Sequence, residues 1–149
     1  GSHENQKFEF LGYGFKPRLV KSSRGELFLG FSPAIADTAV RAISLTIRRW
    51  RLHYRSDASL EELAADINPQ VRGWCNYYGR FYRSAMMPVL KHINEYLVKW
   101  AMRKYKRMHR KQMQARRWLA KVYRDQPELF AHWKFGAVPN SSARVVGAG

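Results

Sequence analysis

A run of basic residues in the second half of the sequence is the feature with the clearest chemistry. Between Tyr96 and Arg124 the chain has eleven Lys or Arg and no Asp or Glu. A solvent-facing helix usually mixes charges, because opposite charges one turn apart stabilise it by about 0.2 to 0.5 kcal/mol and like charges destabilise it similarly. An unmixed basic run is typical of a surface that binds phosphates, so it predicts a nucleic acid as partner.

Basic side chains also line one side of most of the other expected helices, opposite the apolar side. Lys and Arg hold backbone phosphates and thereby position a nucleic acid without reading its sequence. Tyr77 lies off the apolar stripe between Asn76 and Arg80, so it is the best candidate for stacking on a base. The predicted nucleic-acid-binding residues are Arg41, Arg48, Arg51, Arg55, Arg72, Asn76, Tyr77, Arg80, Arg83, Lys99, Arg103, Lys106, Arg110, Arg117, Lys121 and Arg124.

Residue types that act in enzymes are present but do not form a known catalytic pattern. The histidines are scattered, with no His-Glu-x-x-His motif and no Cys/His cluster, so we expect no metal site and no cofactor. Cys75 is the single cysteine, which excludes a disulfide, and its place on an apolar face predicts an inert thiol. We therefore expect a binding protein and not an enzyme.

Three acids close together in the sequence have a simpler explanation than a carboxylate site. Ser59 and Glu62 have the spacing of a capping box, in which each side chain binds the other residue's backbone N–H at the start of a helix. Glu61 and Asp66 are expected to face solvent and to pair with the Arg-rich helices.

Composition and charge exclude several classes of protein. The 149 residues contain 27 Lys and Arg against 11 Asp and Glu, a formal net charge of +16, with 46% hydrophobic and 14% aromatic residues. An acidic disordered chain lacks such apolar content, so the sequence predicts a packed domain. The sequence contains no run of about 18 apolar residues, so it predicts no membrane span. The excess charge favours a polyanionic partner, first a nucleic acid and second an anionic membrane surface.

The expected fold class is mainly α, a bundle of about five helices preceded by a short N-terminal β-hairpin. Alternating aromatic runs at Phe8–Phe15 and Glu26–Phe31 flank a polar turn and predict the hairpin. A first helix begins at Pro33 after Ser32, with an apolar stripe that ends at Tyr54. The last amphipathic helix ends or bends at Pro127.

Proline and capping signals divide the middle of the sequence into further helices. A short helix is expected from the Ser59 capping box to about Ile67, and Asn68 with Pro69 caps the next one. Pro88 begins a long helix on which Lys99, Arg103, Lys106 and Arg110 form one face. Leu129, Phe130 and Trp133 are expected to fold back onto the bundle.

One run of the sequence resembles a known family. Ile67-Asn68-Pro69-Gln70-Val71-Arg72-Gly73-Trp74-Cys75-Asn76-Tyr77-Tyr78-Gly79 is similar to the signature of the maturase-specific domain of group II intron-encoded proteins. Phe8–Tyr13 resembles the closing block of a reverse-transcriptase palm. Ile47–Trp50, Trp100–Lys104 and Leu129–Trp133 are similar to later blocks of the family, so the resemblance spans most of the chain.

The resemblance implies a thumb domain of a reverse transcriptase that assists the splicing of its own intron. Its partners would be group II intron RNA, the RNA/DNA template–primer duplex and the palm of the parent protein. Arg72, Asn76, Arg80 and Arg83 would face RNA, and Lys99, Arg103, Lys106 and Arg110 would follow phosphates. Trp74 and Tyr78 would anchor the signature helix in the core, and His132 would be a hydrogen-bonded core residue. Gly73 and Gly79 suggest a close approach to this helix by another helix or by a phosphate. The polymerase motif Tyr-x-Asp-Asp is missing from this sequence, so the chain is expected not to catalyse.

The domain boundaries follow from the same resemblance. Residues 1–7 are expected to be a tag or linker, 8–31 the hairpin from the end of the palm, 32–135 the helical maturase domain and 136–149 a flexible tail. Such a protein would work in a bacterial cytoplasm or at the nucleoid and would not be secreted.

Rival functions are left open by the sequence. They are a general DNA-binding module, a structural scaffold for the palm whose charge is incidental, and a nuclease or recombinase, which the missing metal cluster argues against.

Overall fold

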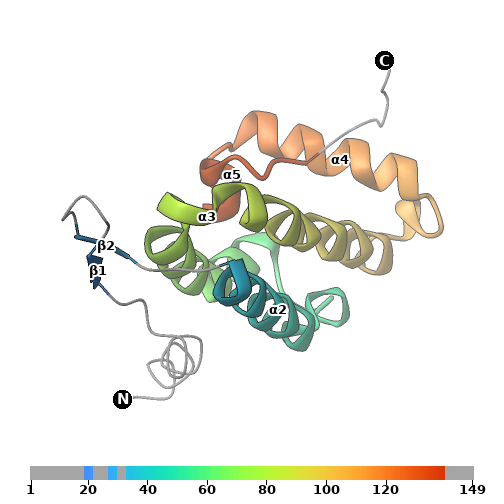
Figure 1. The fold of residues 1–149 in the computed structure, drawn as a ribbon. Coiled ribbons are helices and arrows are strands. Elements are labelled where there is room, and N and C mark those ends of the chain that lie inside the picture. The colour runs from blue at the N-terminus through green and yellow to red at the C-terminus, as the bar shows by residue number, and fades with distance from the viewer. Residues whose placement is uncertain (1–18, 22–26, 30–32, 140–149) are drawn as a thin grey trace. The chain divides into compact units, whose positions relative to one another are not determined.

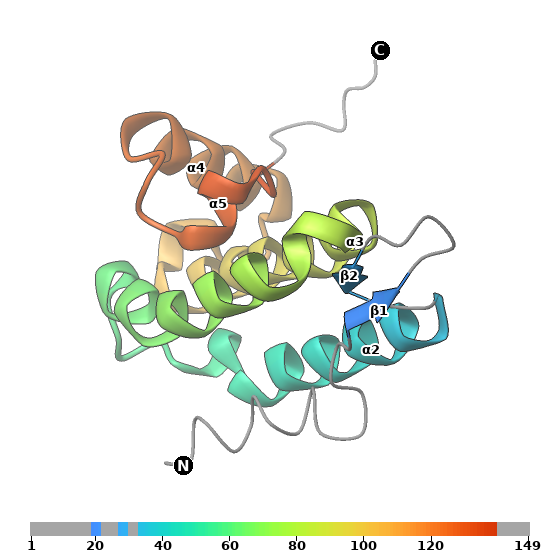
Figure 2. The ribbon, with the colours of Figure 1, turned by 60° about the vertical axis from the view of Figure 1, so that its left-hand side comes forward.

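The computed structural model describes residues 19–21, 27–29 and 33–139. The chain divides into two compact units, Gly1–Thr46 and Ile47–Gly149, and each is described by itself. Figure 1 and Figure 2 show the ribbon from two directions. Among the described residues no helix is long and apolar enough to cross a membrane.

Within its described residues, the first unit contains two short strands and most of one helix. Strands β1 (Leu19–Lys21) and β2 (Leu27–Leu29) pair antiparallel, with Val20 opposite Phe28. Of the predicted hairpin, the strand over Phe8–Phe15 lies outside the described residues, as does the Ser32 cap. Helix α2 (Pro33–Trp50) begins at the predicted proline, the residue whose fixed φ and missing N–H suit a first turn.

Helix α2 ends earlier than its apolar stripe predicts. Ala39, Ile43 and Ile47 are buried as expected, but Arg51 has a left-handed backbone, with φ 51° and ψ 48°, and this conformation ends the helix. The following turn, η1 (Leu52–Tyr54), directs Tyr54 to the surface with 50% of it exposed. The prediction that Tyr54 belongs to the core is therefore wrong.

The second unit is organised around α3 (Leu60–Lys104), which begins with the predicted capping box. Ser59 N–H donates to Glu62 Oε1 at 2.8 Å and Glu62 N–H donates to Ser59 Oγ at 3.0 Å. The remaining elements are η2 (Lys106–Met108), α4 (Gln112–Asp125) and α5 (Ala131–Phe135). Helix α4 runs back alongside the C-terminal half of α3 (Figure 1).

The predicted helix boundary at Asn68 and Pro69 is wrong, because α3 continues through both residues. Pro69 cannot donate to the carbonyl of residue 65, but both Ala65 and Pro69 are exposed, so water can take the place of that bond. Asn68 binds a distant segment instead of capping a helix: its Nδ2 donates to Leu129 O at 2.9 Å, and its Oδ1 accepts from Ala131 N–H at 2.8 Å.

The predicted helix start at Pro88 is also wrong, because α3 continues through this residue. The helix bends instead at Tyr82, whose φ of −133° and ψ of 39° are not helical. In a straight helix Asn68 and Asn94 would lie about 39 Å apart at 1.5 Å per residue. Both side chains instead bind the segment 129–133, Asn68 as above and Asn94 through Trp133 Nε1 at 2.8 Å. The bend thus lets both halves of α3 contact the same segment. Phe130 and Trp133 are buried there, which confirms their predicted return to the core.

Asn94 is the centre of a buried hydrogen-bond network at this junction. Its Oδ1 accepts from Trp133 Nε1 and from His132 Nε2, each at 2.8 Å, and its Nδ2 donates to Ala137 O at 3.1 Å. Complete burial lowers the pKa of His132 to about 3, so the ring is neutral at pH 7. His132 is thus a core residue, as predicted. Ala137, which lies within the predicted flexible tail of residues 136–149, is fully buried, and residues 140–149 lie outside the described residues.

Gly79 allows an aromatic side chain to approach the backbone of α3. A Cβ atom at this position would lie 2.7 Å from Cε1 of Phe135, closer than any ordinary carbon contact. Gly79→Ala is therefore expected to displace the Phe135 ring and lower the free energy of unfolding by about 1 to 3 kcal/mol, despite the better helix propensity of alanine. Urea denaturation measures the change.

A second substitution separates this clash from other effects at Gly79. Phe135→Leu removes the ring atoms that a Cβ would meet, so the double variant with Gly79→Ala is expected to lose less stability than the two single losses added together. Strict additivity of the two losses would contradict the contact.

Candidate nucleic-acid interface

Three positive side chains and two tyrosines come together where η1 meets the C-terminal half of α3. The Cζ atom of Arg51 lies 4.7 Å from the centroid of the Tyr54 ring, and that of Arg103 lies 4.6 Å from the same centroid. Lys99 Nζ lies 5.7 Å from the centroid of Tyr96. We call this group the Tyr54 surface; it consists of Arg51, His53, Tyr54, Tyr96, Lys99 and Arg103.

His53 joins the two tyrosines and reports the local electrostatic potential. Its ring centroid lies 4.2 Å from that of Tyr54 and 5.2 Å from that of Tyr96. The pKa of His53 is lowered, first by burial and then by the positive charges of Lys99, Arg51 and Arg103. Because cations on two different elements act on one imidazole, the Tyr54 surface is positive and favours an anionic ligand.

Backbone contacts fix η1 against α3 and so position the Tyr54 surface. The Trp100 indole N–H donates to Arg55 O at 2.8 Å, and Leu52 is fully buried. Lys104 Nζ donates to Ser56 O at 2.8 Å and to Ala58 O at 3.1 Å. The rings of Tyr54 and Tyr96 are therefore held on a rigid support, and a ligand meets them without a large ordering cost.

Several of the predicted nucleic-acid-binding arginines take part in contacts within the fold. Arg41 pairs with Asp37 and Arg55 pairs with Asp66, each at 2.8 Å, the latter as expected for Asp66. Arg83 donates to Phe135 O, and its Cζ lies 4.2 Å from the centroid of the Phe135 ring. The geometry gives Arg83 a part in holding α5.

The predicted row of Lys99, Arg103, Lys106 and Arg110 is not one helix face. Helix α3 ends at Lys104, Lys106 lies in η2, and Arg110 has a φ of 62° in the turn before α4. Arg51 and Arg55 likewise lie beyond the end of α2 and do not continue the side formed by Arg41 and Arg48. The prediction treated each of these two sets of basic residues as one face of an unbroken helix. Backbone turns interrupt both helices, so neither set forms a single face.

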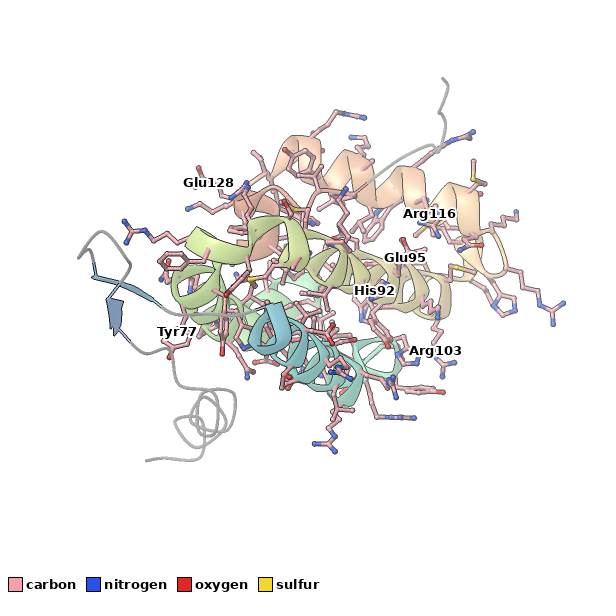
Figure 3. The ribbon with its side chains drawn as sticks, in the orientation of Figure 1. Tyr77, His92, Glu95, Arg103, Arg116 and Glu128 are labelled. Carbon is pink, nitrogen blue, oxygen red and sulfur yellow. The ribbon has the colours of Figure 1, made fainter. Side chains whose placement is uncertain are left out.

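The signature run places its polar residues on the surface of the first half of α3. Arg72, Asn76 and Arg80 are exposed on the first half of α3, as predicted. Tyr77 is half-buried with its ring edge-on to Tyr78, at 4.7 Å between centroids, and burial raises the pKa of its hydroxyl. Figure 3 shows Tyr77 and Arg103 far apart in the second unit. Trp74 and Tyr78 are buried, in agreement with their expected anchoring role.

Helix α4 provides another basic surface, formed by the predicted residues Arg117, Lys121 and Arg124, all exposed. Its neighbour Arg116 makes a structural contact instead, with two hydrogen bonds to Glu95 at 2.6 and 2.8 Å. Glu95 and Arg116 face one another between α3 and α4 (Figure 3). This bidentate pair holds the two helices in register.

The sequence did not identify the aromatic members of the Tyr54 surface. Tyr54 has the spacing of the α2 core stripe, and Tyr96 has no distinguishing neighbour in the sequence. The available signal was the run Arg48, Arg49 and Arg51 directly before Tyr54, since a core tyrosine rarely follows so many cations.

The described residues contain neither a metal-binding cluster nor a reactive thiol. No three His, Cys, Asp or Glu side chains gather within metal-binding distance in the part of the chain that the structure describes. Burial raises the pKa of the Cys75 thiol to about 11, which keeps it protonated and unreactive at pH 7, as predicted.

Comparison with known proteins identifies the family. A family model described as group II intron, maturase-specific domain matches residues 40–124, more than half of the chain. No curated protein and no solved structure shows a significant match. The matched residues include the signature run, η1 and all of α3, and they extend through most of α4. The chain therefore belongs to the family of the group II intron maturase-specific domain.

Proposed function

We propose that this domain binds folded group II intron RNA through the Tyr54 surface and stabilises the form of the RNA that splices. The observation behind the proposal is the position of Arg51 and Arg103 over Tyr54, beside Lys99, Tyr96 and a histidine whose pKa is lowered first by burial and then by these same cations. Membership of the maturase-specific family supplies the choice of RNA.

The chemistry of this surface suits a nucleic-acid backbone with exposed bases at its edge. Guanidinium and ammonium groups neutralise phosphates and release their counterions, which provides affinity that depends on salt. The half-exposed Tyr54, with Arg51 and Arg103 at its ring, offers an aromatic and guanidinium surface against which an unpaired base can pack. The chain would then bind without catalysing, and the splicing reaction would belong to the RNA.

Salt titration tests the electrostatic part of the proposal. If the three cations of the Tyr54 surface each neutralise one phosphate, this surface alone contributes a slope of about −2 to −3 in log K against log salt, or about 20- to 40-fold weaker binding between about 50 and about 200 mM salt. Filter binding of the chain to a transcript of a group II intron measures it. Affinity that is unchanged over this range would contradict the proposal.

Competition separates the proposal from its rivals. A folded intron transcript is expected to displace a labelled intron fragment at lower concentration than duplex DNA of equal length does. A general DNA-binding module would show the reverse order, and a scaffold for a polymerase palm would bind neither. Cleavage of either nucleic acid on addition of Mg²⁺ would indicate a nuclease.

The proposal extends to the parent protein. We infer a reverse transcriptase in a bacterial cytoplasm or nucleoid, in which this domain is the thumb beside the palm and also grips the template–primer duplex. The exposed Arg72, Asn76 and Arg80, none of which belongs to the Tyr54 surface, offer a separate place for that duplex. Binding of an RNA/DNA hybrid that persists when intron RNA saturates the Tyr54 surface would support two separate sites.

A further inference from the structure

A groove of about 510 Å³ lies along α4 beside η2, and none of the residues of the Tyr54 surface lines it. Its walls include Trp118 and Gln114 from α4 and Arg107 from η2. The volume falls within the range of about 300 to 1,000 Å³ that small-molecule sites occupy. The groove is thus large enough for one nucleotide.

Trp118 provides an aromatic face in this groove. Its side chain is only partly buried on α4 and lines the groove. Its ring centroid lies 5.7 Å from that of Tyr105 and 6.2 Å from that of Trp100. These aromatic contacts fix its orientation, so a base that stacks on it meets a rigid surface.

The charges around Trp118 suit a phosphate group. Arg107, Arg117 and Lys121 line the groove and are opposed there by one acid, Asp125. Lys121 Nζ lies 3.3 Å from Asp125 Oδ2, but both side chains are more than half exposed. An exposed pair of this kind contributes little stability, so Lys121 can turn from Asp125 to a phosphate at small cost.

We infer that this groove receives a single unstacked nucleotide of the bound RNA, with its base on Trp118 and its phosphate between Arg107, Arg117 and Lys121. Gln114 and Asp125 are the polar groups within the groove that can hydrogen-bond to the edge of the base. The inference rests on the proposed function in one respect, that the partner is RNA. The groove adds base stacking on Trp118 to the phosphate contacts of the Tyr54 surface. Only an unpaired base can make this contact, because a base paired within a duplex cannot stack on a protein ring.

The test compares a short single-stranded RNA with the same RNA in which one central nucleotide is abasic. Fluorescence anisotropy of the labelled RNA measures binding to the full chain. Trp118→Leu is expected to weaken binding of the intact RNA by about 5- to 100-fold, the effect of losing one base–aromatic stack, and to change binding of the abasic RNA less than twofold. Trp118→Phe keeps a flat ring and is expected to retain most of the affinity.

Trp118 also contacts Trp100 and Tyr105, so its replacement could disturb the fold. A second variant therefore tests the groove without changing these aromatic contacts. Arg117 and Lys121 are exposed, so replacing both by alanine leaves the packing intact. This double variant is expected to weaken the intact and the abasic RNA by the same factor, since both RNAs keep the phosphate. Circular dichroism of each variant checks its helical content.

Two outcomes would overturn the inference. One is equal affinity of the unaltered chain for the intact and abasic RNA; the other is equal loss of affinity for both RNAs in Trp118→Leu. Neither outcome affects the proposed function, which would fail instead if substitutions at the Tyr54 surface left binding of the intron transcript unchanged.

Discussion

Asn94→Leu is expected to lower the free energy of unfolding by about 3 to 5 kcal/mol. Leucine fills a similar volume but leaves the indole N–H of Trp133, the ring N–H of His132 and the carbonyl of Ala137 without partners in a buried site. Each unsatisfied buried group costs about 1 to 3 kcal/mol, and partial relaxation of the segment reduces the sum. Urea denaturation followed by circular dichroism measures the loss.

Asn76→Leu is the matched control for this prediction. It makes the same chemical change on the same helix, but Asn76 is exposed, so its effect on the free energy of unfolding is expected to stay within about 0.5 kcal/mol. A loss below about 1 kcal/mol in Asn94→Leu would show that the three groups find water or other partners. It would contradict the role of Asn94 in fixing α5 to the bent α3.

Reversing the charge of Lys99 and Arg103 together is expected to weaken binding of intron RNA by about 100-fold at about 0.1 M salt. The double variant Lys99→Glu with Arg103→Glu removes two phosphate contacts, so the slope of log K against log salt is expected to become shallower by about two. The two new carboxylates also repel the RNA. Filter binding across a salt series provides both numbers.

A charge-matched control distinguishes local contacts from net charge. Lys91 and Lys134 are exposed and lie outside the predicted binding residues, so reversing both changes the net charge equally. This control is expected to weaken binding by less than about tenfold, because exposed charges more than about 10 Å from the RNA are largely screened at 0.1 M salt. Equal losses in the two double variants would mean that net charge alone attracts the RNA.

The charge reversal has a second, structural readout at His53. Burial and then the positive charges of Lys99, Arg51 and Arg103 lower the pKa of His53, so glutamates in place of Lys99 and Arg103 are expected to raise it. The pH dependence of the His53 ring signals in NMR spectra measures this shift without any RNA. An unchanged pKa would show that these side chains do not approach His53 in solution.

Local sequence signals correctly predicted the start of a helix where residues within one turn determine that start. The Ser59 and Glu62 capping box and the helix that begins at Pro33 depend on residues within one turn, and both predictions are confirmed. The signal at Asn68 and Pro69 failed because a longer-range interaction competes with it. The Asn68 side chain is used by residues more than 60 positions away, which no local pattern contains.

Gly79 is another residue whose contact partner cannot be identified from its neighbours in the sequence. Its place in the signature run indicated a close approach to the helix, by another helix or by a phosphate. The tertiary structure identifies the neighbour as the ring of Phe135, 56 positions away in sequence. The sequence thus predicted the need for a small residue, and only the return of α5 decided what fills the space.

Charge, composition and the signature run determined by themselves that the protein is helical, strongly basic and a member of the maturase-specific family, because these properties belong to the residues in order. Only the tertiary structure decided which cations act together. The backbone of Arg51 turns out of α2 and α3 bends at Tyr82, so Arg51 and Arg103, 52 positions apart, meet over one tyrosine. A periodic pattern assumes an unbroken helix, and both changes of direction depend on contacts between segments distant in the sequence.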